Sequence, residues 1–137
     1  MAGKSQYLEK ALLDHVFGKT TYTGPTTVYV GLLTAAPSDT GGGTEVSGGS
    51  YARAGLTNNT TNFPNATGGS PASKSNGAAI TFPAPTANWG TITHFGIYDA
   101  SSAGNLLYWA ALTASKTVNN GDAAPSFAIG ALSITED

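Results

Sequence analysis

The spacing of hydrophobic and polar positions changes along the chain, and the change predicts two kinds of element. Residues 5–17 place apolar side chains at the i, i+3, i+4 and i+7 spacing of one helix face, with Ser5 as a candidate N-cap. From residue 26 onwards the apolar positions alternate with a period of two, which is typical of strands. The pattern therefore predicts one N-terminal helix, about 5–17, followed by a β core of about 26–135.

The β core divides into short strands separated by turn-forming residues. We expect strands over 26–34, 51–57, 78–82, 91–98, 106–112 and 126–135. The first of these has apolar residues on both sides, which predicts a central strand covered on both faces. Strict alternation in 91–98 places Phe95 and Ile97 on one face and Ile92 on the other. The predicted fold class is mainly β: an antiparallel β-sandwich or small barrel with one N-terminal α-helix, in a single domain over 1–137.

Two segments between the strands have the composition of loops. Residues 38–50 and 58–77 are rich in Gly, Ser, Thr and Asn and contain few large apolar side chains. Connections longer than about 12–15 residues are uncommon in compact domains unless they serve a function or are mobile. We therefore predict that both segments are contact elements.

The composition favours a subunit of an assembly. Only 10% of the 137 residues are charged and the net charge is −2, whereas soluble domains usually have about 25% charged residues. The surface must therefore consist largely of small, neutral side chains, which are readily desolvated against another chain. We expect self-association, most simply as a homo-oligomer.

The same composition excludes several classes of protein. Without Cys there is no disulfide framework, thiol nucleophile or cysteine-ligated metal site. Six basic residues are too few for a nucleic-acid-binding face. No apolar run approaches the roughly 18 residues of a membrane span, and the first ten residues lack the apolar core of a signal peptide. We therefore expect synthesis in a cytoplasm, with neither nucleic acid nor membrane as a partner.

The groups that catalysis or metal binding would need are scattered. His15 and His94 are the only histidines, and neither has acidic residues at metal-ligand spacing. A Ser–His–acid arrangement and paired carboxylates are not recognisable, and Glu136 and Asp137 are assigned to the chain tail. We therefore predict no enzyme activity, no catalytic residue, no cofactor and no metal.

Five aromatic residues lie close together in the last third of the chain and leave two interpretations open. They are Trp89, Phe95, Tyr98, Tyr108 and Trp109. Large aromatic side chains fill sandwich cores, and those with a polar atom also suit interfaces. Exposed on a surface, the same rings could instead form a platform that stacks against a sugar.

Five segments, taken in order, resemble a family of small virion proteins of tailed phages that is commonly labelled tail-fibre-like. They are YLEKALLDHVFG (7–18), TVYVGLLTAAP (27–37), EVSGGSYAR (45–53), WGTITHFGIYDA (89–100) and GNLLYW (104–109). The resemblance spans most of the chain. It implies a structural role within a phage virion, with no enzyme activity and no cofactor.

The position on the virion is predicted from shape. A fibre shaft is built from long repeats or trimeric β-helices, and the sequence contains neither. We therefore favour a head decoration (cement) protein that binds the assembled lattice of the major capsid protein. The alternative is a tail or connector accessory protein of fibre-like type, with host-surface glycan binding as a further option. The candidate interface residues are Leu8, Leu12, Val16, Tyr51, Arg53, Phe63, Trp89 and Trp109.

Overall fold

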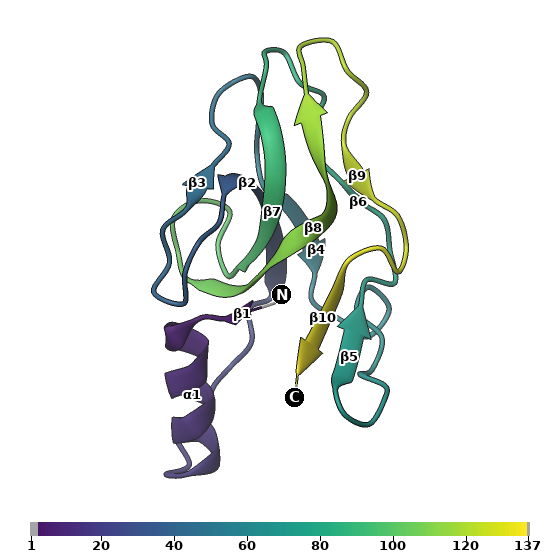
Figure 1. Cartoon of the computed structure of the whole chain (residues 1–137). Helices are drawn as coiled ribbons and strands as arrows, with labels where there is room; N and C mark the ends of the chain where they lie inside the picture. The colour runs from purple at the N-terminus through teal and green to yellow at the C-terminus, as the bar shows by residue number, and fades with distance from the viewer. Residues whose placement is uncertain (1–2, 137) are drawn as a thin grey trace.

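The computed structural model describes residues 3–136, so the predicted domain over 1–137 includes three residues outside the described range. Its elements in chain order are β1 (Gly3–Lys4), α1 (Gln6–Val16), β2 (Thr27–Ala35), β3 (Thr44–Glu45), β4 (Ala54–Thr57), β5 (Ala72–Ser75), β6 (Ile80–Thr81), β7 (Gly90–Tyr98), β8 (Leu106–Val118), β9 (Ser126–Phe127) and β10 (Ser133–Glu136). Strands predominate and one helix lies near the N-terminus (Figure 1). The predicted mainly β class is therefore confirmed.

The helix α1 forms where the sequence predicts it, because its N-cap, its apolar face and its C-terminal end all favour a helix at this place. The Ser5 hydroxyl oxygen caps the helix by accepting a hydrogen bond from the Leu8 N–H at 3.2 Å. Leu8 itself is buried, with 3% of its surface exposed. Phe17 is the C-cap, and Gly18 follows with a φ of +130°, which glycine adopts without a steric penalty.

The main sheet has the strand order β1–β8–β7–β2. The edge of β2 that faces away from β7 pairs with β4 over its first half and with β3 near its end. All of these strand pairs are antiparallel. β2 is a central strand, as predicted, and Val30 and Leu33 on its opposite faces are both fully buried. The sheet does not close on itself, so the small-barrel alternative is wrong and a sandwich-like arrangement holds.

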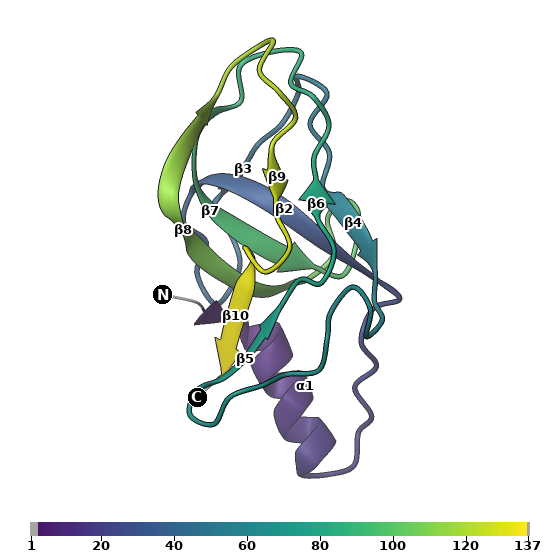
Figure 2. The ribbon, with the colours of Figure 1, turned by 90° about the vertical axis from the view of Figure 1, so that its right-hand side faces the viewer.

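A smaller layer covers one face of the main sheet. β6 pairs with β9, and the two lie over the side of the main sheet that Figure 2 shows. Aromatic rings join the layers: Phe95 of β7 meets Phe127 of β9 with ring centroids 5.7 Å apart, and Phe82 meets Phe127 at 6.2 Å. The core therefore lies between the main sheet and this layer.

An irregularity in the pairing of β7 with β8 changes which side chains share a face. The pairing of β7 with β8 shifts register between Ile92 and His94. Ile92, Phe95 and Ile97 consequently belong to one buried core cluster. The prediction that Ile92 lies opposite the other two is wrong, because regular pairing is interrupted here: residues 112–115 of β8 lie opposite Thr93 alone.

The prediction of a single last strand over 126–135 is also wrong, because this segment contains two strands, β9 and β10, which belong to different sheets. A turn separates them, in which Gly130 has a φ of +77° and the Ala131 N–H donates to the Ala128 carbonyl at 2.9 Å. The large apolar residues change from odd positions before Gly130 to even positions after it. A single strand buried on both faces also has apolar residues at odd and even positions, so this pattern does not by itself reveal the break.

Short strands also form inside the two predicted loops. β3 lies within 38–50 and β5 within 58–77. Other predicted strands change length: β8 continues six residues past position 112 to Val118, whereas β4 and β6 occupy only parts of 51–57 and 78–82. Strands this short are stabilised by distant pairing partners, so their local composition carries little signal.

α1 and the β5–β10 pair extend from the same end of the β layers (Figures 1 and 2). β5 and β10 are antiparallel, with Ala72 opposite Glu136. β1 adds to the edge of β8 beside them, with Gly3 opposite Trp109. This end of the molecule therefore combines segments from both ends of the chain with the long segment 58–77.

Candidate functional site

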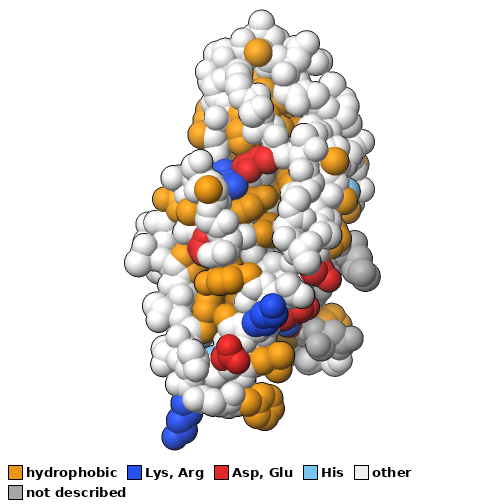
Figure 3. All heavy atoms as spheres, turned by 90° about the vertical axis from the view of Figure 1, so that its left-hand side faces the viewer, with side chains coloured by type: hydrophobic (Ala, Val, Ile, Leu, Met, Phe, Trp, Pro, Cys, Tyr) orange, Lys and Arg blue, Asp and Glu red, His pale blue; other side chains and the backbone are white. Residues whose placement is uncertain are grey.

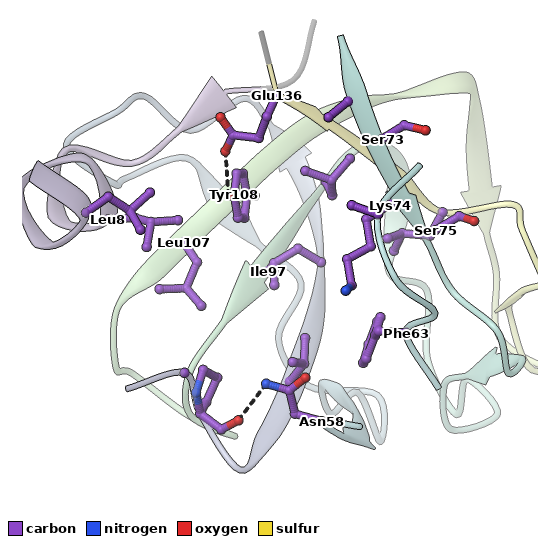
Figure 4. A pocket seen from close by; sticks show the side chains of 18 of the residues that line it. Leu8, Asn58, Phe63, Ser73, Lys74, Ser75, Ile97, Leu107, Tyr108 and Glu136 are labelled. Atoms are coloured by element: carbon purple, nitrogen blue, oxygen red, sulfur yellow. Dashed lines mark hydrogen bonds between the residues drawn. The ribbon is translucent and has the colours of Figure 1, made fainter. Parts of the chain in front are cut away.

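An apolar groove lies between α1, the main sheet and the β5–β10 pair, with a volume of about 360 Å³. α1 contributes Leu8 and Leu12, and the main sheet contributes Ile97 and Leu107 (Figure 4). Further apolar and aromatic residues around it are Val28, Phe63, Tyr108, Leu132 and Ile134. A hollow of this size lined by apolar side chains is the usual form of a binding site in a protein.

The C-terminal end of α1 exposes a second set of apolar side chains. The exposed fraction is 59% for Leu13, 65% for Val16 and 76% for Phe17. Since successive residues of a helix are about 100° apart, Leu13 and Phe17 lie on the side of α1 away from Leu8. We call Leu13, Val16 and Phe17 the helix tip. A contiguous group of exposed apolar residues is typical of an interaction surface.

Charged side chains accompany this surface. Figure 3 shows the face that carries α1, where red and blue side chains lie beside apolar ones in the lower half of the molecule. Lys74 of β5 extends into the groove (Figure 4), and its ammonium group forms no ion pair with the residues between 3 and 136. A lone lysine in an apolar groove favours an occupant that combines apolar groups with a carboxylate.

An ion pair at the edge of the groove joins β1 to β10. Lys4 Nζ lies 2.7 Å from one carboxylate oxygen of Glu136, and the Tyr108 hydroxyl donates to the other oxygen. The composition of the chain end assigns Glu136 to a tail, and that assignment is wrong, because Glu136 belongs to β10. Asp137, assigned to the same tail, lies outside the described residues.

We expect acid to weaken this connection between the two chain ends. Burial raises the pKa of Glu136, but hydrogen bonds from Lys4 and Tyr108 and the charge of Lys4 lower it further, so the pKa lies below its ordinary value. A carboxyl group of this kind stabilises the fold above its unfolded pKa, and the contribution is lost as the pH falls through the folded pKa. The difference in melting temperature between the wild type and Glu136→Gln should therefore shrink between about pH 6 and about pH 3. A difference that stays constant over this range would contradict the expectation.

A second ion pair, between Arg53 and Glu45, is more enclosed. The Arg53 guanidinium donates to both carboxylate oxygens of Glu45 at 2.8 Å, and only 7% of its side chain is exposed. It also donates to the carbonyls of Ala100 and Ala103 and lies 3.5 Å above the centre of the Tyr98 ring. The pair therefore attaches the loop between β7 and β8 to β3.

Tyr51 connects this ion pair to the core. Its hydroxyl donates to Glu45 and accepts from the Leu32 N–H, both at 2.8 Å, and its ring meets Trp89 edge to face at 5.3 Å. Burial and the negative charge of Glu45 raise the pKa of the Tyr51 hydroxyl well above its ordinary value, so the group stays a neutral donor. Tyr51 and Arg53, both predicted as interface residues, thus have extensive contacts inside the chain.

The two tryptophans also have internal contacts. Trp89 is buried, with 5% exposed, and its indole N–H donates to the Gly49 carbonyl at 2.9 Å. Trp109 is half-buried beneath Gly3, where a Cβ would lie 2.6 Å from the indole ring. Among the described residues, the Trp109 indole nitrogen has no hydrogen-bond partner. Of the aromatic cluster, Trp89, Phe95 and Tyr98 therefore pack inside the protein, whereas Tyr108 and Trp109 are half-buried and Tyr108 lines the groove.

Four predicted interface residues come together at the groove and the helix tip. Leu8, Leu12 and Phe63 line the groove, and Val16 belongs to the tip. Leu8 is buried within the chain, so it supports the groove and is not itself an exposed contact. Sequence reasoning missed Leu13 and Phe17 because they lie outside the main apolar face. Their i, i+4 spacing on the otherwise polar side of the helix is the signal that could have identified them.

The two histidines have structural hydrogen bonds. The Tyr22 N–H donates to His15 Nδ1 at 3.1 Å, and His94 Nδ1 lies 2.8 Å from the Thr93 hydroxyl oxygen. In the part of the chain that the structure describes, no three His, Asp or Glu side chains gather into a potential metal site. No helix between residues 3 and 136 is both long and apolar enough to span a membrane.

The comparison with protein families covers almost the whole chain. The family model of the Podophage GP4 fiber I protein gp80 matches residues 3–135. The chain belongs to this family. It is therefore a structural protein of the phage virion, as the resemblance of the five segments predicted. No curated protein matches the chain.

In this phage virion protein, the segments that carry the resemblance build the frame around the contact surface. They contain α1, β2, β7 and the start of β8, together with both residues of the Glu45–Arg53 ion pair. β5 and β10, which form one wall of the groove, lie outside those segments. The frame thus holds α1 opposite that wall and leaves the groove between them.

Proposed function

We propose that the protein is a non-enzymatic accessory subunit on the tail side of the phage, where it associates with tail or connector proteins as part of the fibre apparatus. The observation that carries this proposal is the match of residues 3–135 to a family described as a fiber protein. An apolar groove and an exposed apolar helix tip at one end of the fold support a role in protein contacts.

Binding, and no chemical step, would perform this function. Only 10% of the residues are charged, so few charged groups lose hydration when the surface meets another virion protein. An interface that exists only in the assembled particle adds its binding free energy to the assembled state. Repeated over the copies in one virion, even modest contacts stabilise the attachment.

A head decoration protein on the lattice of the major capsid protein is the second candidate. It is favoured by the form of the fold, because the described strands run from two to 13 residues and build short sheets without a shaft. A compact body of this kind is suited to occupy a site on a surface lattice.

Locating the protein on the virion tests the two candidates. Antibody fragments raised against the purified protein are bound to intact virions and imaged by electron microscopy. We expect the label at the tail side. A label distributed over the head lattice would contradict the fibre assignment and support head decoration.

The properties of particles that lack the protein should also distinguish the two candidates. If it belongs to the fibre apparatus, we expect filled heads with unchanged resistance to heat and osmotic shock, and slower adsorption to host cells. Heads that lose their resistance while adsorption stays normal would instead identify a cement role.

A further inference from the structure

The helix tip and the groove complement each other, and we propose that the groove of one copy binds the helix tip of a second copy of this chain. The contact would place Leu13, Val16 and Phe17 of one copy between α1 and the β5–β10 pair of another. This association goes beyond the proposed function, because it does not depend on whether the virion carries the protein on its tail or its head.

Size and polarity agree for this contact. The groove volume, about 360 Å³, lies at the lower end of the roughly 300–1,000 Å³ typical of ligand pockets. It suits the side chains of one helical turn and is too small for a whole helix. Leu13 and Phe17 are one turn apart on the same side of α1, so both can enter one hollow together. Such a contact would cover the most exposed apolar side chains of the helix.

One pair of opposite charges agrees with this contact. Lys74 extends into the groove, whereas Asp14 lies on α1 within one turn of Phe17. Both side chains are exposed, and neither forms an ion pair with the residues that the structure describes. The C-terminal end of a helix is also partially negative, which favours a nearby lysine. Glu136, an acidic residue that also lines the groove, already forms an ion pair with Lys4.

The occupant must come from another molecule. The side of α1 that carries Leu8 faces the groove of its own chain, while Leu13 and Phe17 lie on the opposite side. A tip therefore cannot turn into its own groove without unwinding the helix. Reciprocal exchange between two copies gives a closed dimer, and one-way exchange gives a ring or a longer series of copies.

Charge reversal in the purified full chain tests this contact. Sedimentation velocity over a range of concentrations should show the wild type in assemblies with masses that are multiples of 13.8 kDa. We expect Asp14→Lys and Lys74→Glu each to weaken the association about tenfold, because each places like charges opposite one another. The double variant restores an attractive pair in reversed order, and its association should return to within about threefold of wild type.

Matched variants separate the contact from general effects. Phe17→Ser should weaken the association about 30-fold or more, because it removes the central apolar group of the tip. Lys116→Glu, an exposed lysine of β8 that does not line the groove, should leave the association unchanged. Thermal melts verify that each variant is folded.

Three outcomes would overturn the proposal. They are a wild-type protein that is monomeric at every concentration, an association that neither charge reversal weakens, and a double variant that associates no better than the single ones. A monomeric protein that Phe17→Ser removes from virions would also overturn it, because the tip would then bind a different virion protein.

Discussion

Asn76→Ala is expected to lower the free energy of unfolding by about 3 kcal/mol, which corresponds to a fall in melting temperature of roughly 10 °C or more. Asn76 is almost fully buried, with 1% exposed. Its side-chain amide donates to the carbonyls of Ala78 and Ala128, both at 2.9 Å, and its side-chain oxygen accepts from the Leu132 N–H at 3.0 Å. Alanine would leave these three backbone groups without their side-chain partner, and an unsatisfied buried group costs about 1–3 kcal/mol.

The position of Asn76 explains why one side chain has so large an effect. It lies between β5 and β6 and holds the turn between β9 and β10, where its own carbonyl also accepts from the Gly130 N–H at 2.8 Å. Losing it should therefore loosen the wall of the groove as well as the fold. Unfolding in denaturant measures the change in free energy.

Two variants serve as controls for Asn76→Ala. Asn65→Ala replaces an exposed asparagine in the same predicted loop and should change the stability by less than about 0.5 kcal/mol. Asn76→Asp keeps the accepting oxygen but turns the donating group into an acceptor that faces two carbonyls, so it should destabilise at least as much as alanine. A stable Asn76→Asp variant would show that the hydrogen bonds do not carry the effect.

Arg53→Ala is expected to cost a similar amount, about 3 kcal/mol, because it leaves the carboxylate of Glu45 and two loop carbonyls without their partner. The cation–π contact with the Tyr98 ring is lost as well. Arg53→Lys should recover only part of this stability, because an ammonium group cannot form the paired hydrogen bonds of a guanidinium group. Chemical denaturation of both variants checks the order.

A double-mutant cycle isolates the pair itself. With Glu45→Gln and Arg53→Ala, the two single changes should cost more in sum than the double variant, with a coupling of about 1–2 kcal/mol. Lys116→Ala, which removes an exposed cation, should have little effect. If Lys116→Ala destabilised the protein as much as Arg53→Ala, net charge would be responsible and the buried ion pair would not.

The positions of these residues show how far sequence reasoning reaches for the candidate site. Leu8 and Leu12 were predicted as one apolar face of a helix, and that face does line the groove. Phe63 belongs to a segment that is predicted as a contact element, and it lines the same groove as Leu8 and Leu12. Asn76 gave no signal, because one polar residue in a polar segment looks the same whether its side chain is buried or solvated. Arg53 was singled out, but for an interface, while its partners inside the chain lie up to 50 residues away.

The sequence by itself determined α1, the central strand β2 and the β7–β8 hairpin, because a helix cap, an apolar period and a glycine-containing turn act over a few residues. It also determined the sparsely charged surface, because composition does not depend on the fold. Only the tertiary structure decided that β9 and β10 separate at Gly130, that the irregular pairing of β7 with β8 places Ile92 in the core with Phe95, and that a groove lies between α1 and β5. Each of these depends on pairing between segments far apart in the chain. The free energy of such pairing comes from burial and hydrogen bonds between distant residues, which no local pattern records.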